Sequence, residues 1–213
     1  MKLEVKNISK SIKDKIILDG IDLTLEGGRV YGFVGRNGCG KTMLFRAISG
    51  LMNVDAGEIV WDGKKLHADI SILPNLGIVL ENAGLYPEFS GFKNLEMLAK
   101  LKKIADKDMI KTAIERVGLD PKDKRPIRKY SLGMKQRIVL AQAIMERPEV
   151  LMLDEPTNAL DEEGIDRIRR IVKEEKERGA LVLLASHNKE DISILADEVF
   201  YMKDGRLVEG DVV

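Results

Sequence analysis

The chain has 213 residues, which is enough for one large domain or for a core with an inserted subdomain. Hydrophobic residues make up 44% and charged residues 33%, so the chain can bury a sizeable core and remain soluble. Lysine plus arginine and aspartate plus glutamate both number 35, and this balance argues against nucleic acid as the main partner. The single cysteine, Cys39, excludes an intrachain disulfide and a cysteine metal cluster.

Two further features bear on location. No apolar run approaches the ~18 residues that a membrane span needs. The first residues, MKLEVKNISKS, lack the apolar segment of a secretory signal. We therefore expect a soluble protein of a reducing cytoplasm, and a membrane-bound partner remains compatible with the sequence.

The first part of the chain has mostly the period-two apolar alternation of strands, and one helix interrupts it. We expect strands in LEVKNI (3–8), in IILDGIDLTL (16–25) with a turn-like Asp19-Gly20, in RVYGFVG (29–35), and at 57–61 and 76–80, with the helix at 41–50.

The rest of the chain has helical spacing, broken by short apolar runs that are typical of buried strands. A hairpin around Asp204-Gly205 is expected in the tail. The predicted helices lie in 91–117, at 131–147 and at 161–178, and the predicted strands are EVLMLDE and ALVLLAS.

Alternation of apolar strands with helices predicts an α/β fold with a mostly parallel sheet covered on both faces. The N-terminal strands predict an additional antiparallel part, and residues 86–147 look like a helical insertion. We therefore expect a single domain over 1–213, with a core formed by 1–85 and 148–213 and a helical subdomain at about 86–147.

The strongest motif is GRNGCGKT at 35–42, which follows an apolar strand and opens a helix. It matches the phosphate-loop pattern, in which backbone N–H groups surround phosphates. Lys41 then reaches the β- and γ-phosphates, and the Thr42 hydroxyl can hold Mg²⁺. A dinucleotide fingerprint is excluded because Met43 stands where a third small residue belongs. The residues expected to bind nucleotide here are Gly35, Arg36, Asn37, Gly38, Cys39, Gly40, Lys41, Thr42 and Met43.

A second motif is VLMLDEP at 150–156, an apolar strand that ends in two acids. Ligands of open α/β sheets bind at this carboxyl edge. Asp154 is the expected partner of Mg²⁺ through water, and Glu155 is placed to activate the attacking water as general base.

Three other positions are ambiguous when taken alone. YSLGMKQR at 130–137 predicts a helix start, with Ser131 as the cap and Gly133 allowing close backbone approach. Such a start is an anion site, although the phosphate loop already supplies one. His187 follows an apolar strand and can be structural or functional, and Asp161 fits a helix cap.

Together, GRNGCGKT, SLGMKQR, LMLDEPT, ALD and SH, in this order, resemble an ABC-transporter nucleotide-binding domain. The resemblance implies that two such domains pair head to tail, as a homodimer or with a related ATPase subunit. Each signature helix then faces the γ-phosphate of ATP on the other chain's phosphate loop. It further implies that Ser131 and Gly133 contact that phosphate, that His187 is the switch histidine that senses it, and that Asp161 lies in the loop joining the sites. The expected catalytic residues are Glu155, His187 and Lys41.

Two positions depart from the family pattern. Ile12, in KSIKDK, stands where the family usually has an aromatic residue that stacks on adenine. Glu81, in GIVLEN, stands where the family usually has glutamine. A carboxylate can bind Mg²⁺ but cannot donate through an amide.

The resemblance implies an ATPase that powers an exporter through separately encoded membrane subunits, on the cytoplasmic face of the cell membrane. Glu81, GLYPEFSGFKNL and YSLGMKQR resemble the subfamily that exports bacitracin and lantibiotic peptides. Residues 82–94 are the expected dock for a membrane subunit. Tyr86, Phe89 and Phe92 are either its apolar contacts or core packing of the helical insertion.

Two alternatives stay open at this point. One is a soluble ABC ATPase that acts on ribosomes or DNA, although the chain has neither a second such domain nor a basic surplus. The other is a nucleotide-binding regulator without turnover, which Glu155 argues against.

Overall fold

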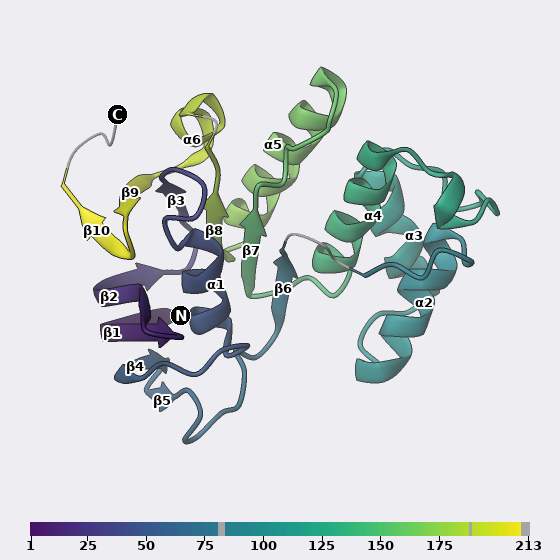
Figure 1. The fold of residues 1–213 in the computed structure, drawn as a ribbon. Coiled ribbons are helices and arrows are strands. Elements are labelled where there is room, and N and C mark those ends of the chain that lie inside the picture. The colour runs from purple at the N-terminus through teal and green to yellow at the C-terminus, as the bar shows by residue number, and fades with distance from the viewer. Residues whose placement is uncertain (81–83, 188, 210–213) are drawn as a thin grey trace.

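The computed structural model of the chain describes residues 1–80, 84–187 and 189–209 (Figure 1). Within these residues the larger sheet has six strands, and all neighbouring strands run parallel except β9 and β10. In spatial order they are β10 (Arg206–Val208), β9 (Glu198–Lys203), β3 (Val30–Val34), β8 (Leu181–Ala185), β7 (Val150–Asp154) and β6 (Leu76–Val79).

The three central strands β3, β8 and β7 are buried along their whole length. Their sequences are almost entirely apolar, as expected for parallel strands covered on both faces. The register pairs Val150 with Leu181 and Asp154 with Ala185, so β7 and β8 end at the same edge of the sheet. That edge brings Asp154 and the residues after it close to the segment that follows β8.

The smaller sheet is antiparallel, and its edge strand β2 differs from what the sequence predicts. The turn predicted at Asp19-Gly20 is wrong, because β2 continues through both residues. The turn to β1 lies instead between the two strands, at residues 13–14. Gly20, with φ of 59°, donates its N–H to Ser9 Oγ at 3.0 Å and marks a shift in register. In spatial order the described strands of this sheet are β2 (Lys15–Glu26), β1 (Lys2–Ile12), β4 (Ala56–Trp61) and β5 (Lys64–Lys65).

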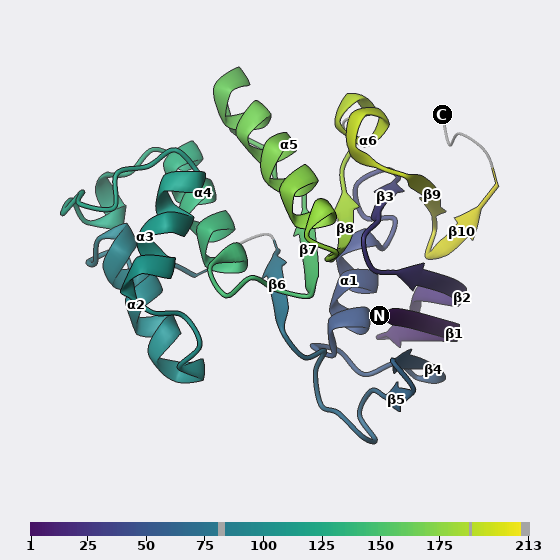
Figure 2. The same cartoon turned by 180° about the vertical axis from the view of Figure 1, so that it is seen from behind.

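Helix α1 (Lys41–Ser49) lies between the two sheets (Figures 1 and 2). Its Leu44, Phe45 and Ile48 are fully buried in a hydrophobic cluster that contains residues of both sheets. The other helices pack in a second cluster against the opposite face of the parallel sheet. The predicted fold class is thereby confirmed, and α1 is held rigidly with its first residue at the phosphate loop.

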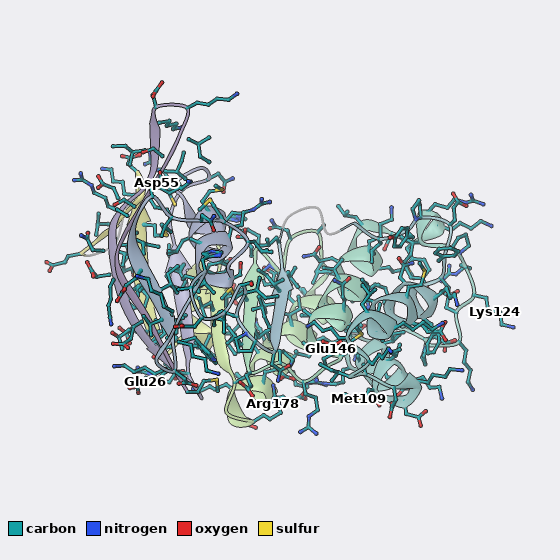
Figure 3. The ribbon with its side chains drawn as sticks, turned by 90° about the horizontal axis from the view of Figure 1, so that it is seen from below. Glu26, Asp55, Met109, Lys124, Glu146 and Arg178 are labelled. Carbon is teal, nitrogen blue, oxygen red and sulfur yellow. The ribbon has the colours of Figure 1, made fainter. Side chains whose placement is uncertain are left out.

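A group of helices separates β6 from β7 in the chain and lies on the far side of the parallel sheet from the antiparallel one (Figures 1 and 2). Seen from below, Lys124 of this group and Glu26 of β2 lie at opposite ends of the molecule (Figure 3). The proposed boundaries at about 86–147 remain a prediction. The group contains α2 (Gly91–Lys102), α3 (Lys107–Arg116), the 3₁₀ helix η1 (Ile127–Lys129) and α4 (Leu132–Ile144).

Two helices follow β7 in the chain. Helix α5 (Glu162–Glu177) was predicted, whereas the short α6 (Lys189–Leu195) was not. Asp161 caps α5 by accepting a hydrogen bond from Gly164 N at 3.0 Å, which confirms its predicted capping role. None of the helices in the described residues has both the length and the apolar character that crossing a bilayer requires.

Candidate functional site

The loop between β3 and α1 has the backbone that a phosphate loop needs. Gly40, at the start of α1, has φ of 116°, a conformation that residues with a side chain rarely adopt. A Cβ at Gly35 would lie 2.4 Å from Met202 O, so this position has room only for glycine. The loop therefore packs directly against β9 with no side chain between them.

The predicted hairpin around Asp204-Gly205 is present, and its turn fixes the phosphate loop from outside. Gly205 N donates to Cys39 O at 2.9 Å, and Cys39 N donates to Arg36 O at 3.2 Å. The Cys39 side chain is buried at the base of the loop, as expected for a residue present for its backbone. Residues far apart in the sequence thus hold the loop in one shape before any ligand binds.

A cavity of about 300 Å³ lies over the loop at the carboxyl edge of the sheet. Lys41 is almost completely buried beside it, and its Nζ donates to Gly35 O at 2.7 Å. The same Nζ lies 4.0 Å from Glu155 Oε1. The lining consists of Ile17, Asn37, Gly38, Gly40, Lys41, Thr42, Met43, Asp154 and Glu155.

Thr42 and Asp154 meet on one wall of this cavity. The Thr42 hydroxyl donates to Asp154 Oδ2, and Asp154 is buried at the end of β7. A hydroxyl and a carboxylate are the oxygen donors that Mg²⁺ prefers, so this pair fits the predicted metal. Glu81, the third predicted ligand, lies outside the described residues.

Glu155 and His187 form the second polar pair at the cavity. Glu155 Oε2 lies 2.7 Å from His187 Nδ1. Glu155 Oε1 is buried and, among the described residues, has no hydrogen-bond donor. Glu155 has φ of 50°, while its N–H donates to Ala185 O at 2.8 Å. The structure therefore brings Lys41, Glu155 and His187 together, although they are widely separated in sequence.

The start of α4 is built differently. Ser131 Oγ accepts a hydrogen bond from Met134 N at 3.1 Å, which confirms the predicted cap. Ser131 and Leu132 are exposed, and a Cβ added at Gly133 would lie 3.0 Å from Ala159 O. Gly133 thus permits the close backbone approach expected of it. Neither Ser131 nor Gly133 lines the cavity over the phosphate loop.

Sequence reasoning missed Ile17 as a wall of the cavity. It predicted instead that Ile12 contacts the nucleotide base. Ile12 lies at the end of β1 and is 42% exposed. Because Ile17 lies in the apolar alternation of β2, it carries no local signal of a binding role. The stacking role of Ile12 stays a prediction.

The fold and this site define a P-loop nucleotide-binding protein. Residues 18–158 match the family described as ABC transporter. A solved ATP binding subunit of an ABC transporter has a TM-score of 0.87 at 24% identity, covering 97% of this chain and 88% of that chain. A dimeric ATP-binding cassette in a post-hydrolysis state with ADP and Pi has a TM-score of 0.86 at 21% identity, covering 98% and 97%.

Curated relatives are similar over nearly the whole chain. The uncharacterized ABC transporter ATP-binding protein YybJ of Bacillus subtilis is 47% identical over 211 residues, covering 99% of this chain and 97% of the relative. The bacitracin transport ATP-binding protein BcrA of Enterococcus faecalis is 36% identical over 209 residues, covering 97% and 68%. The lantibiotic transport ATP-binding protein SrtF of Streptococcus pyogenes is 31% identical over 206 residues, covering 97% and 89%.

The chain belongs to the ABC transporter family, as one of its ATP-binding, ATP-hydrolysing proteins. The resemblance inferred from the motifs is thereby confirmed. Because these relatives are ATP-binding proteins of transporters, they favour the transporter prediction over a soluble ATPase that acts on ribosomes or DNA.

Proposed function

We propose that the cavity over the phosphate loop binds ATP together with Mg²⁺. Lys41 Nζ, which now donates to Gly35 O, would turn to the β- and γ-phosphate oxygens. Thr42 and Asp154 would hold the metal, with Glu81 as the third proposed ligand. When bound, Mg²⁺ neutralises part of the charge on the phosphate oxygens.

The observation that best supports ATP hydrolysis is that the two carboxylate oxygens of Glu155 differ in their hydrogen bonding. Oε2 lies 2.7 Å from His187 Nδ1, which orients the carboxylate, while Oε1 is buried without a donor among the described residues. Lys41 Nζ, at 4.0 Å from Oε1, is too far to donate a hydrogen bond, and a buried acceptor without a donor is costly, so a water in the cavity would satisfy it. Oε1 then accepts a proton from that water while the water oxygen attacks the γ-phosphorus. The bond between the γ-phosphorus and the bridging oxygen breaks, and that oxygen leaves with ADP.

The second anion site, at the start of α4, is proposed to complete the site of another copy or of a related subunit. Ser131 and Leu132 are exposed, and the free N–H groups of a helix start favour phosphate charge. In a head-to-tail pair, Ser131 and Gly133 of one chain would face the ATP of the other. ATP binding would close the pair, and hydrolysis with product release would open it.

We further propose that the pair powers export of a peptide, drug or antibiotic-like cargo through separate membrane subunits. Similarity to proteins named for bacitracin and lantibiotic transport supports this proposal. The place of action would be the cytoplasmic face of the cell membrane. The cargo itself would be selected by the membrane subunits.

The proposed contact with those subunits is the exposed aromatic pair that precedes α2. Tyr86 and Phe89 are 54% and 38% exposed, and their ring centroids lie 6.1 Å apart. Phe92, in contrast, packs against the hydrophobic core of the helices. Asn94 orders this segment, because its Oδ1 accepts from Tyr86 N at 2.7 Å and its Nδ2 donates to Tyr86 O at 3.1 Å.

The test is transport in inside-out vesicles that contain the membrane protein encoded beside this chain. With ATP outside, an exporter carries bacitracin into the lumen. Tyr86→Asp combined with Phe89→Asp should leave ATP hydrolysis by the isolated chain intact but abolish copurification and transport. Leu101→Asp combined with Ile104→Asp is the matched control, because both residues are exposed apolar side chains, Leu101 in the last turn of α2 and Ile104 just after it.

Two results would contradict these proposals. Copurification of the Tyr86 and Phe89 double variant at the normal level would remove the aromatic pair from the interface. ATP-dependent loss of bacitracin from loaded inside-out vesicles would mean uptake rather than export.

A further inference from the structure

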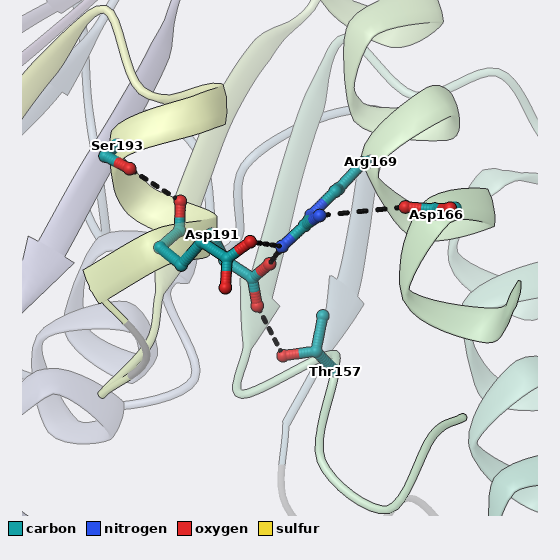
Figure 4. Close-up of polar contacts among 6 residues, drawn as sticks. Thr157, Asp166, Arg169, Asp191 and Ser193 are labelled. Carbon is teal, nitrogen blue, oxygen red and sulfur yellow. Dashed lines mark hydrogen bonds and ion pairs between the residues drawn. The ribbon is translucent and has the colours of Figure 1, made fainter. Parts of the chain in front are cut away.

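A polar cluster connects three parts of the chain (Figure 4). Thr157 follows β7, Arg169 lies on α5, and Asp191 lies on α6. The Thr157 hydroxyl donates to Asp191 Oδ2 at 2.9 Å. Arg169 donates to Asp191 Oδ1 from Nε at 2.9 Å and from Nη2 at 2.7 Å.

Asp191 is the centre of this cluster. Its side chain is only 1% exposed, and each of its oxygens has a different partner. The hydrogen bonds that Arg169 donates to Asp191 raise the pKa of the Arg169 guanidinium, although burial opposes this shift. A buried carboxylate with both oxygens occupied holds its neighbours in one geometry.

The cluster lies next in sequence to the two polar residues proposed for catalysis. Thr157 is two residues after Glu155, and Asp191 is four residues after His187. The same two segments already meet where Glu155 Oε2 lies 2.7 Å from His187 Nδ1. The Thr157–Asp191 hydrogen bond is therefore a further side-chain link between the segment that carries Glu155 and the segment that carries His187, in addition to the backbone hydrogen bond from Glu155 N to Ala185 O.

The Thr157–Asp191 link matters because the His187 side chain is open to solvent. It is 57% exposed, so packing does not fix its position. Glu155 is also in an uncommon conformation, with φ of 50°. We propose that Asp191 is a positioning residue for ATP hydrolysis, which acts through Thr157 to hold Glu155 and His187 at hydrogen-bond distance. This inference rests on the proposed role of Glu155 as general base.

A purely structural role for Asp191 would involve mainly its other oxygen. The ion pair with Arg169 connects α5 to α6 and does not include Thr157. Replacing Thr157 therefore removes the link to the catalytic segment and leaves the helix-to-helix ion pair in place. The two roles can be separated by a substitution at position 157.

The experiment compares variants of the full chain by steady-state ATPase kinetics and thermal melting. Thr157→Val keeps the shape of the side chain and removes its hydroxyl, and we expect kcat to fall about tenfold with KM for ATP unchanged. The melting temperature should fall as well, because the buried Asp191 Oδ2 loses its donor. Thr157→Ser restores the hydroxyl and should recover most of kcat. Ser193→Ala is the matched control, because Ser193 Oγ donates only within α6, to Glu190 O at 2.8 Å.

A double-variant test identifies the route of the effect. If Thr157 acts through Glu155, the residual rate of Glu155→Gln should not fall further when Thr157→Val is added. A slow Glu155→Gln with normal kcat in Thr157→Val overturns the inference on Asp191 and leaves the proposed function standing. The inference also fails if the melting temperature falls together with kcat and Thr157→Ser recovers neither. Near-normal turnover of Glu155→Gln overturns both proposals.

Discussion

The phosphate-loop site and the start of α4, which we propose as two anion sites, differ in what surrounds them: among the described residues, only the first gathers several buried polar side chains on one cavity. Around the phosphate loop, Lys41, Asp154 and Glu155 are all less than a tenth exposed and lie on one cavity. At the start of α4, Ser131 is exposed, and its Oγ accepts a hydrogen bond from the N–H of Met134 in the same helix.

This difference supports our proposal that the two regions complete one another across an interface. A helix start stabilises phosphate charge at short range only, so it must come close to the nucleotide to act. The cavity of one chain is lined without Ser131 or Gly133. A second chain would supply them and would also cover Leu132, which is 68% exposed.

We expect the largest effect at the phosphate-loop site. Glu155→Gln keeps the shape of the side chain and removes the proton acceptor, so turnover should fall ~10²–10⁴-fold while MgATP still binds. The variant should also accumulate as an ATP-bound dimer on gel filtration. Glu149→Gln is the control, because Glu149 is an exposed acid immediately before β7. Turnover near the normal rate would remove Glu155 from its role.

A smaller effect, on ATP affinity, should distinguish the phosphate-loop site from the start of α4. Lys41→Ala should weaken ATP binding to the dilute chain by about 1.5–3 kcal/mol, roughly 10- to 100-fold, because a charged donor to phosphate is lost. Ser131→Ala should leave this affinity nearly unchanged. Titration calorimetry measures both variants at a concentration that keeps the chains apart. Equal losses in both would show that the start of α4 contacts the nucleotide of its own chain.

The smallest expected effect concerns the base. Ile12→Tyr should tighten ATP by roughly 1 kcal/mol if the ring stacks on adenine. Calorimetry on the variant and the parent chain checks this change. An unchanged affinity would mean that another residue, such as Ile17 on the cavity wall, already covers the base.

The parts that sequence predicted best are those determined locally. The phosphate loop combines glycine, lysine and threonine within eight residues. The spacing of apolar residues predicted most of the helices and most of the strands of both sheets. The prediction of a turn at Asp19-Gly20 was wrong, although this dipeptide is typical of turns. In the structure Gly20 instead allows an irregularity inside the long strand β2.

The parts that sequence could not predict depend on long-range packing. Glu155 and His187 were each identified, but their hydrogen bond requires β7 and β8 to be neighbours in register. Thr157 and Asp191 are 34 positions apart, and Asp191 lies on a helix of seven residues that was not predicted. Such contacts arise only when the whole fold brings the elements together.

The most direct measurement of the shared site is complementation between two damaged chains. Lys41→Ala damages the phosphate loop, and Ser131→Ala damages the start of α4, so each homodimer contains two defective sites. In a mixed dimer, one site combines both lesions and the other combines an intact loop with an intact helix start. Ser90→Ala is the matched control, because Ser90 caps α2 in the way that Ser131 caps α4.

ATPase activity and ATP-dependent dimerisation, by light scattering, are measured over a range of mixing ratios. A shared site predicts that the mixture of Lys41→Ala and Ser131→Ala recovers activity, or at least dimerisation, that neither protein shows alone. Ser90→Ala should remain active without any partner. If two well-folded variants recover neither property at any ratio, the start of α4 does not act across an interface, and the account of a shared site is contradicted.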